Sequence, residues 1–323
     1  MPFNSLIGRA DAAALIPEDA AMDIIKSVPE TSAVMRLARR LTNMSSAQRR
    51  LPIMNALATA YFVSGDTGLK QTSEVSWANK YIDAEELAVI VPIPEAVLDD
   101  NSFDIWSEVR PALVEAFGIA IDQAVLYGTN IPATWTTNLG AAGLVALATA
   151  AGNTVSAAAF ADLYEAIMGE TAAGVDGLLM TLEADGYVAT GHVAHVSMRG
   201  KLRNTRSTVG EPLFKANMQD STRFDLDGAP IYFPTNGAIN AATSLLVSGQ
   251  WDQLVYAMRQ DITYKILDQA VIQDAAGNTI YNLAQQDMVA LRAVMRLGFA
   301  LPNPINRMQA TAANRAPFAV LTA

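Results

Sequence analysis

The chain has 323 residues, of which 51% are hydrophobic and only 17% are charged, and its formal net charge is −10. This composition excludes a disordered protein, and the acidic balance excludes a dedicated reader of nucleic acid, which would carry a basic face. The charged fraction lies below the roughly 25% of ordinary soluble domains, which predicts that part of the surface is buried by self-association.

The sequence contains no cysteine, which excludes disulfides and thiolate metal sites. The N-terminal stretch lacks the basic and apolar regions of a signal peptide, and the longest apolar run, 141–151, is too short to cross a bilayer. We therefore expect a soluble protein that is made in the cytoplasm and has no membrane contact.

Residues 1–50 are predicted to form an N-terminal arm without a core of its own. Helix signals over 18–27 end before Pro29, and a second short amphipathic stretch covers 33–44. Basic residues cluster in the second half of the arm, and two interpretations stay open: a solvated face, or ion pairs with the acidic body of a neighbouring subunit. The cluster consists of Arg36, Arg39, Arg40, Arg49 and Arg50.

Residues 51–94 are predicted to form a long antiparallel hairpin. The outgoing limb is 51–63 and the return limb is 87–94, in which Leu87 to Ile93 alternate on one face. Prolines in the return limb mark it as an edge strand. A ribbon of two strands is only marginally stable in water, so the hairpin is expected to lie on another surface.

The stretch between the two limbs is polar and contains glycine, yet Val75 and Trp77 interrupt it. These two side chains favour contact with a partner, and Lys70 and Lys80 lie close to them in the sequence. We regard all four as candidates for contact between subunits.

A long helix over 102–128 is the element around which the rest of the chain is organised. Ser102 is a candidate N-cap, and Gly128 is placed to adopt the left-handed conformation after the last turn. Pro111 predicts a kink, or a restart of the helix close to that residue. The apolar face repeats at steps of three and four residues through Trp106, Val109, Leu113, Phe117, Ala120, Ala124 and Tyr127.

The remainder mixes strands and helices without regular alternation, which predicts an α+β fold. After a turn-rich segment at 128–143 we expect a helix over 154–170, capped by Thr154. Its inward residues are Phe160, Leu163, Tyr164 and Ile167. The further elements expected are strands at 177–181 and 192–198, a basic helix at 199–208 ending at Gly210, a strand and turn at 227–237, two or three strands over 244–267 and a strand at 287–302.

Motifs that carry chemistry are weak in this sequence. Asp66 begins an Asp-Thr-Gly tripeptide, as in aspartic proteases, but no second such tripeptide exists and a hairpin turn uses the same residues. His192 and His195 are three apart on a predicted strand and so point to opposite faces, which disfavours a shared metal. The remaining candidates for anion binding form a charged helix face, namely Lys201, Arg203 and Arg206. We expect no catalytic residue, no metal and no cofactor.

Several short patterns, taken in order, resemble the major capsid protein of tailed bacteriophages, the Hong Kong 97-type fold. They cover roughly 35–310, and each alone is a loose pattern. The residues that carry the resemblance are VPIPEAVLDD at 91–100, IDQAVLYG at 121–128, SMRGKLR at 197–203, GEPL at 210–213, DGAPIY at 227–232, SGQWDQLV at 248–255 and VALRAVMRLG at 289–298.

The resemblance implies how the chain is divided and what it does. A shell protein of this type assembles into hexamers and pentamers of an icosahedral virion capsid around double-stranded DNA, which an acidic chain contacts weakly and without sequence specificity. A portal would complete the shell. The implied parts are the arm (1–50), an extended hairpin loop that laps over the adjacent subunit (51–94), a peripheral domain with the long spine helix (95–128 and 251–310), an axial domain (129–250) and a C-terminal tail (311–323).

Two departures from the family pattern add expectations. Some members begin with a cleaved helical scaffolding segment, whereas this chain begins with the arm, so a separate scaffolding protein is expected. Members that crosslink themselves join a hairpin lysine to an asparagine ahead of the last strand, and the matching residue here is Asp287, so no such bond is expected. The alternatives are an encapsulin-type compartment that packages an enzyme, and an enzyme that uses Asp66.

Overall fold

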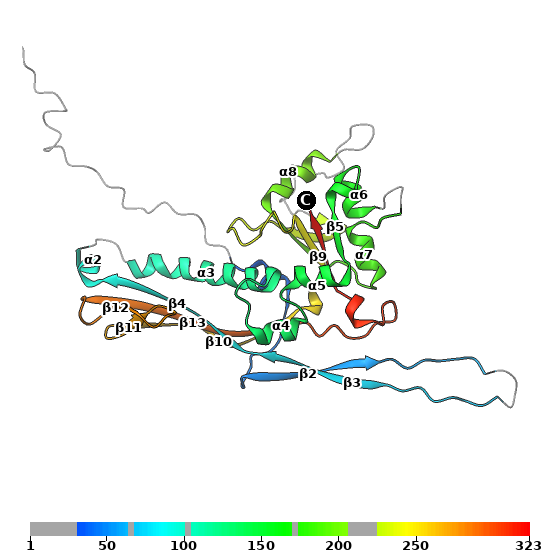
Figure 1. Cartoon of the computed structure of the whole chain (residues 1–323), viewed down its shortest axis with the longest axis horizontal. Coiled ribbons are helices and arrows are strands. Elements are labelled where there is room, and N and C mark those ends of the chain that lie inside the picture. The colour runs from blue at the N-terminus through cyan, green and yellow to red at the C-terminus, as the bar shows by residue number, and fades with distance from the viewer. Residues whose placement is uncertain (1–30, 64–67, 101–104, 170–173, 206–224) are drawn as a thin grey trace, which may run out of the picture.

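The computed structural model describes residues 31–63, 68–100, 105–169, 174–205 and 225–323, and these form two bodies and one projecting ribbon (Figure 1). The helices are α1 (Ala33–Leu37), α2 (Glu95–Asp100), α3 (Ile105–Tyr127), α4 (Ala133–Leu139), α5 (Leu144–Ala151), α6 (Leu163–Met168), α7 (Leu178–Ala184) and α8 (Val196–Asn204), with short 3-10 turns at 157–159, 251–253 and 312–314. The strands are β1 (Arg39–Arg40), β2 (Gln48–Ala56), β3 (Ser76–Asp83), β4 (Glu85–Pro94), β5 (Thr154–Ser156), β6 (Gly191–Ala194), β7 (Asp225–Leu226), β8 (Ala229–Tyr232), β9 (Leu246–Gly249), β10 (Val255–Leu267), β11 (Val271–Gln273), β12 (Thr279–Asn282), β13 (Met288–Ala300) and β14 (Phe318–Thr322).

The first body is α3 lying along one face of a four-stranded sheet (Figure 1). The helix runs through Pro111 without a restart, so that part of the expectation is wrong, and the proposed cap at Ser102 lies outside the described residues. Gly128 ends the helix with φ +72°, as predicted, and its N–H donates to the Ala124 carbonyl at 3.0 Å. Leu113 and Phe117 are buried against the sheet, which confirms the predicted apolar face.

The sheet has the order β1-β10-β13-β4, so β4 is an edge strand, as its prolines predict. The strand predicted at 287–302 is confirmed by β13, which pairs antiparallel with β10 on one side and β4 on the other. Cross-strand neighbours Ala293 and Val89, and likewise Leu291 and Val91, share the face that packs on α3. The intervening residues therefore point to the opposite face of the sheet, called the underside below.

The second body is a six-stranded mixed sheet in the order β5-β14-β9-β6-β8-β7, covered by the short helices α6, α7 and α8. Residues 318–322 were expected in a C-terminal tail, but they form β14, which lies between β5 and β9 with four of its five residues buried. Their apolar sequence provides the physical reason, because a strand inside a sheet is buried on both faces.

Three local predictions in this region are wrong. The turn-rich segment at 128–143 contains α4. The helix expected over 154–170 is split into β5, a 3-10 turn and the short α6, whose cap is Asp162 rather than Thr154. Tyr164 is exposed instead of inward. The strand expected at 177–181 is the start of α7, since periodicity cannot separate a short buried strand from a short buried helix.

The other elements expected in this body are partly confirmed. The strand predicted at 192–198 ends at Ala194, and α8 follows from Val196, three residues before the predicted start of the basic helix. The predicted helix end at Gly210 is wrong, because α8 ends at Asn204 and Thr205 is already extended. The strand and turn at 227–237 and the strands over 244–267 are confirmed by β8, β9 and β10.

The predicted hairpin is present with a different return limb. Strand β2 pairs with β3, with Arg50 opposite Tyr81 and Met54 opposite Trp77, whereas β4, the expected return limb, joins the four-stranded sheet. The stronger apolar alternation of β4 reflects its contact with α3 rather than a place in the hairpin. The ribbon leaves the body on the underside of the sheet (Figure 1).

The ribbon crosses the sheet at Gly298 of β13. A Cβ atom added there would overlap the Asp83 carbonyl group and the Ile82 side chain, so only glycine allows the two backbones to approach this closely. Ile82 is fully buried at the same point. The root of the hairpin is therefore packed directly on the sheet.

Of the arm, residues 31–50 are described. The amphipathic stretch predicted over 33–44 forms a helix only over the five residues of α1, and the chain then extends through β1, which pairs parallel with β10 at the edge of the sheet. The helix ends early because this segment hydrogen-bonds to β10 instead of to itself.

Candidate functional site

The outer face of the β2-β3 ribbon carries large side chains that no part of the described chain covers. The cross-strand pair Met54 and Trp77 and the nearby Tyr81 are exposed, Trp77 by 67%. Arg50 lies on the same face, opposite Tyr81. Contiguous exposed apolar side chains of this kind mark an interaction surface.

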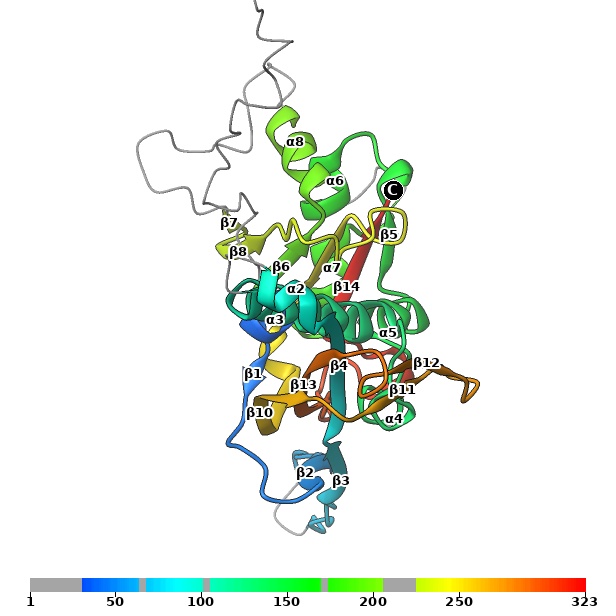
Figure 2. The same ribbon diagram turned by 90° about the vertical axis from the view of Figure 1, so that its left-hand side faces the viewer.

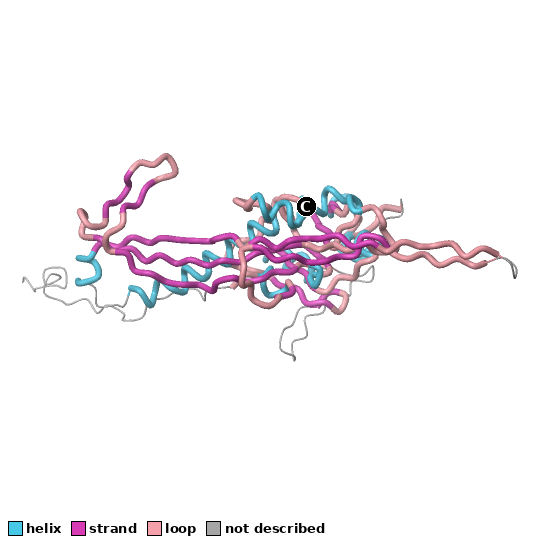
Figure 3. The backbone as a smooth tube through the Cα atoms, turned by 90° about the horizontal axis from the view of Figure 1, so that it is seen from below, coloured by secondary structure: helices cyan, strands magenta, loops and turns pink. Residues whose placement is uncertain are grey.

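Beyond Ala56 the two limbs continue as an extended ribbon away from the body (Figure 3). The limbs stay together through hydrogen bonds from the Thr59 N–H to Ser73 Oγ at 2.7 Å and from the Tyr61 hydroxyl to the Gln71 carbonyl at 2.9 Å. Phe62 is fully exposed and Leu69 is 88% exposed. The described residues of this distal part make no contact with their own body that would offset the exposure of these side chains.

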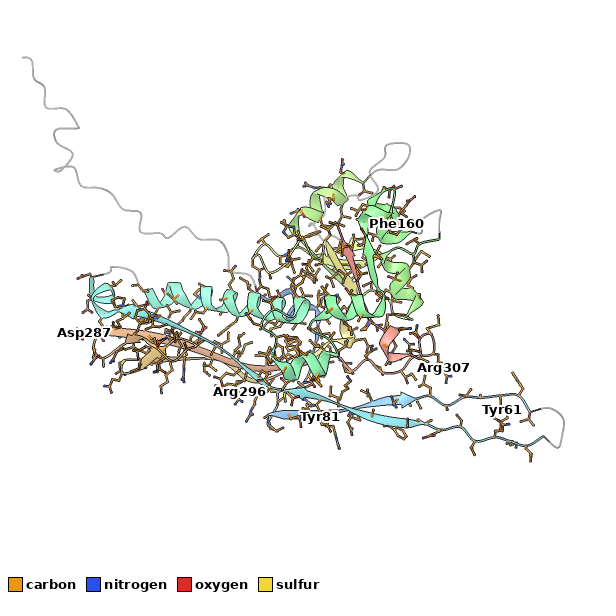
Figure 4. The ribbon with its side chains drawn as sticks, in the orientation of Figure 1. Tyr61, Tyr81, Phe160, Asp287, Arg296 and Arg307 are labelled. Carbon is orange, nitrogen blue, oxygen red and sulfur yellow. The ribbon has the colours of Figure 1, made fainter. Side chains whose placement is uncertain are left out.

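The root of the ribbon is fixed to the segment that follows β13. The Arg307 guanidinium donates to the Ala58 carbonyl at 2.7 Å, and the Ile305 N–H donates to the Met54 carbonyl at 3.3 Å (Figure 4). Asn306 in the same segment donates to the Asp185 carbonyl at 2.7 Å. The direction of the ribbon is therefore set by its own subunit.

The underside of the four-stranded sheet presents a second uncovered surface. Across the strands, Lys265, Arg292 and Ile90 form one row, and Gln260, Arg296 and Glu86 form another. Val294, between the two arginines, is only 9% exposed, as expected where the stems of long side chains cover a neighbouring apolar group.

These two arginines are incompletely paired within the described chain. Their Nε atoms are buried without a hydrogen-bond partner, and the only ion pair between described residues is Arg296 with Glu86 at 4.0 Å. Arg292 has the cation Lys265 as its cross-strand neighbour instead of a carboxylate. A buried guanidinium N–H without an acceptor is costly, so this surface favours an acceptor from outside the chain.

The nine residues predicted as subunit contacts do not form one cluster. Arg36 lies over the Tyr232 ring at 4.6 Å, and Arg49 donates to the Thr42 carbonyl and hydroxyl, both at 2.9 Å, so these two are engaged within the chain. Val75 and Lys80 are half-buried. The exposed members are Arg36, Arg39, Arg40, Arg50, Lys70 and Trp77, of which Arg40 also donates to Asn43 Oδ1 at 3.3 Å.

Sequence reasoning missed Met54, Tyr81, Phe62 and Leu69. The first lies in an apolar run that suggested a buried limb, yet strict alternation places it on the face of Arg50 and Pro52, and this signal could have identified it as outward. The arginine row on the underside was also missed.

The chemical motifs are dispersed in the structure. His192 lies buried in β6, whereas His195 caps α8 by accepting from the Ser197 N–H at 3.2 Å, so the two serve different elements. Among the residues that the structure describes, no cluster of His, Asp or Glu could hold a metal ion. Asp66 and Arg206 lie outside those residues, and Asp287 occupies a turn with φ +47°.

Burial is the main cause of the pKa shifts of His192 and Asp122. It lowers the pKa of His192 to about 4, and the ring nitrogens contact Ser248 Oγ at 2.7 Å and the Leu226 carbonyl at 3.1 Å. Burial raises the pKa of Asp122 on α3, against the opposing effect of hydrogen bonds from Ser32, Ala33 and Val34. Neither group lies near the ribbon or the underside, so we assign both to the fold.

The sequence profile of the Phage capsid family matches residues 12–307. The chain belongs to this family. The "Major capsid protein" of Staphylococcus phage 80alpha is 27% identical over 278 residues, which cover 85% of this chain and 78% of the relative. The solved structure described as "Microbacterium phage Oxtober96" has a TM-score of 0.81 and 32% identity, with 98% of this chain and 99% of that chain covered. The structure described as "Mycobacterium phage Adephagia" has a TM-score of 0.77 and 29% identity, with 98% of both chains covered.

These matches confirm the resemblance to tailed-phage major capsid proteins and the Hong Kong 97-type α+β fold. This phage capsid protein is a component of an oligomeric shell, the virion capsid, and the encapsulin alternative is not favoured. The helices in the described ranges are too short or too polar to cross a bilayer.

Proposed function

We propose that this capsid protein forms hexamers and pentamers in which the ribbon of one subunit lies on the sheet underside of the next. The observation that carries the proposal is geometric. The ribbon lies just below the four-stranded sheet and runs along the direction of its strands. It points away from the end of the sheet that carries α2 and the β11-β12 hairpin (Figures 1 and 3). A second copy placed beyond the ribbon tip would therefore bring its own underside over the ribbon.

Such a contact is head-to-tail, since two different surfaces of the same chain meet. Repetition of a head-to-tail contact closes into a ring when the rotation allows it, and rings of five and six are the units that an icosahedral shell needs. In the proposed contact, Phe62 and Leu69 of the ribbon meet the exposed Ile90.

Charge supports the same arrangement. The underside offers two arginines and one lysine against a single carboxylate, on a chain whose net charge is −10. Ribbon carbonyl groups and Glu74 would supply the acceptors that the Nε atoms of Arg292 and Arg296 lack. The predicted contacts Trp77, Lys70, Val75 and Lys80 lie on the same ribbon, and the proposal retains them.

The predicted arm arginines stay part of the proposal as a second contact region. Arg39 and Arg50 are exposed and can meet an acidic neighbour. Arg40 is exposed too but donates to Asn43 Oδ1 at 3.3 Å, and Arg36 and Arg49 also have partners in their own chain. We propose the division into arm, hairpin loop, peripheral domain and axial domain with the predicted boundaries, changed where β4 and β14 belong to the two sheets.

A cysteine pair tests the contact, because the natural chain contains no cysteine. With Phe62→Cys and Ile90→Cys in one chain, mild oxidation of assembled particles is expected to give a ladder of covalent oligomers on a denaturing gel, up to six subunits. The matched control joins Phe62→Cys to Val188→Cys, which replaces an exposed residue of the axial body. Particles that yield no ladder, or an equal ladder from the control pair, would contradict the proposed contact.

The shell is proposed to enclose double-stranded DNA through weak, non-specific contacts, as the acidic charge requires. Shells from producing cells should contain nuclease-protected double-stranded DNA, and a protein cargo without DNA would favour the encapsulin alternative instead. Synthesis in the host cytoplasm, a separate scaffolding protein, a portal and the absence of catalytic activity stay predictions. Peptide hydrolysis at acid pH by the intact chain, lost in Asp66→Ala, would contradict the last of these.

A further inference from the structure

Residues 32–44, called the strap below, lie across both bodies of the subunit before the chain enters the ribbon. Along the four-stranded sheet, the strap follows the edge of β10. The N–H groups of Arg39, Leu41 and Met44 donate to the carbonyls of Leu254, Tyr256 and Met258 at 2.9, 2.8 and 2.8 Å. This part of the strap is therefore an added edge of the peripheral sheet.

The other part of the strap contacts the six-stranded sheet. Leu37 lies so close to Gly191 of β6 that a Cβ atom at that glycine would overlap it, and the same glycine faces Trp251. The Arg36 guanidinium lies over the ring of Tyr232 on β8. One short segment thus holds onto both bodies.

Between these contacts, a single carboxylate receives the first turn of α1. Asp122 of the spine helix α3 is fully buried and accepts hydrogen bonds from Ser32 Oγ, from the Ala33 N–H at 2.9 Å and from the Val34 N–H at 3.0 Å. Ser32 Oγ also accepts from the Met35 N–H at 3.0 Å, so the serine hydrogen is directed to Asp122. Within the described residues, Asp122 has no ion-pair partner.

We propose that Asp122 is the receptor for a detachable strap, and that docking of the strap fixes the angle between the two bodies. All three donors come from the strap, so the charge of this buried carboxylate is compensated only while the strap is docked. Ala33 and Val34 are buried in the cluster of side chains that α3, the peripheral sheet and the six-stranded sheet all share. Undocking would therefore free both bodies at once.

Hydrogen exchange on the full-length protein tests the receptor. In Asp122→Ala the buried strap N–H groups lose their acceptor, and exchange over 33–44 is expected to accelerate at least thirtyfold. Asp122→Asn keeps the size but turns one acceptor into a donor, and about a tenfold acceleration is expected. Peptides from β13 should keep their natural protection in both variants. Asp274→Asn, in an exposed turn on another strand pair, is the matched control and should change nothing over 33–44.

If Asp122→Ala fails to fold, the milder Asp122→Asn and Ser32→Ala decide the matter, since each removes part of the contact. Natural exchange rates over 33–44 in both of these variants would overturn the receptor assignment.

The second half of the proposal needs a distance between the bodies. Spin labels at Ala112→Cys on α3 and Ala184→Cys on α7, both exposed positions, report that distance in the otherwise cysteine-free chain. Combined with Asp122→Asn, the distance distribution is expected to broaden or shift. An unchanged distribution in a variant whose strap exchanges rapidly would show that the strap does not set the angle, and this part would be overturned. The result is independent of whether the ribbon makes the proposed contact between subunits.

Discussion

The six-stranded sheet and the β2-β3 ribbon show opposite relations between a chain and its surroundings. All four residues of β6 are buried, whereas no residue of β2 is. The sheet buries its apolar faces under its own helices, and its polar groups find partners within the subunit. The described part of the ribbon keeps aromatic side chains in solvent and is fixed to the body at its root. The first region is complete in one subunit, and in the proposed assembly the second gains its burial from other subunits.

Removal of the ribbon is expected to have the largest effect and tests most directly whether the ribbon depends on other subunits. Replacing residues 57–75 with Asn-Gly joins Ala56 to Ser76 through a tight turn. Since the described residues among those deleted contact their own body mainly through Ala58, the subunit is expected to fold and shell formation to be lost completely. Electron microscopy for shells and calorimetry for folding measure the two outcomes. Normal shells from this variant would refute the division into a complete and an incomplete region.

Two phenylalanines allow a matched test at the level of single residues. Phe299 is fully buried, with its ring 5.2 Å from Trp135 and 5.5 Å from Tyr256, so Phe299→Ala should lower the free energy of unfolding by about 3–5 kcal/mol. Phe62→Ala should leave that free energy within about 0.5 kcal/mol of the natural value and weaken assembly. Chemical denaturation and light scattering measure these quantities, and similar losses of stability in both variants would contradict the comparison.

The six-stranded sheet should lose stability in acid because His192 of β6 becomes protonated. Burial lowers the pKa of His192 in the folded state to about 4, from an ordinary 6.5. The contribution of neutral His192 to the free energy of unfolding is therefore fully present above pH 6.5. It is lost as the pH falls toward 4, which lowers that free energy by roughly 3 kcal/mol. His192→Gln should remove this slope, and His195→Gln, on the exposed cap of α8, should keep it. Denaturation midpoints between pH 4 and 7 measure the slope. An identical slope in His192→Gln would assign the acid sensitivity to other groups.

The smallest effect is expected at the ribbon root. Arg307→Ala removes the charged hydrogen bond to the Ala58 carbonyl, which is worth about 1–2 kcal/mol locally. Hydrogen exchange at 56–61 should accelerate while the global unfolding free energy changes little. Arg203→Ala, on α8 of the second body, is the control. Unchanged exchange at the root would show that the crossing at Gly298 alone fixes the ribbon.

The fold could be predicted from the sequence where a residue pattern is compatible with only one secondary structure. The spacing of Leu113 and Phe117 with a closing Gly128 permits only an amphipathic helix, and the alternation of β13 permits a strand. The start of α7 failed because four apolar residues suit a buried helix or a buried strand equally. The prediction of the return limb was wrong because strand pairing is decided by residues far away in the sequence. The apolar residues of β4 alternate because one face of that strand packs on α3, and β4 pairs with β13 rather than with β2.

The candidate site was predictable only in part. Trp77 stood out because an aromatic residue within polar sequence has few reasons to be there. Arg292 and Arg296 could not be recognised, since their significance depends on which cross-strand neighbours they receive, and a lysine opposite Arg292 is a product of the register of β10. Pairing across long sequence distances is the information that local patterns lack.

The backbones of β13 and of the ribbon strand β3 cross closely at Gly298, and this crossing limits how the subunit can adapt to the curvature of a shell. In the proposed assembly, pentamers and hexamers meet their neighbours at different dihedral angles, so one subunit type must bend in two ways. The crossing leaves no room for a methyl group, and Arg307 holds the ribbon from the other side, so the pivot is rigid. Flat and sharply curved parts of the shell must then be accommodated along the limbs beyond Ala58, which makes these limbs the compliant element of an otherwise stiff tile.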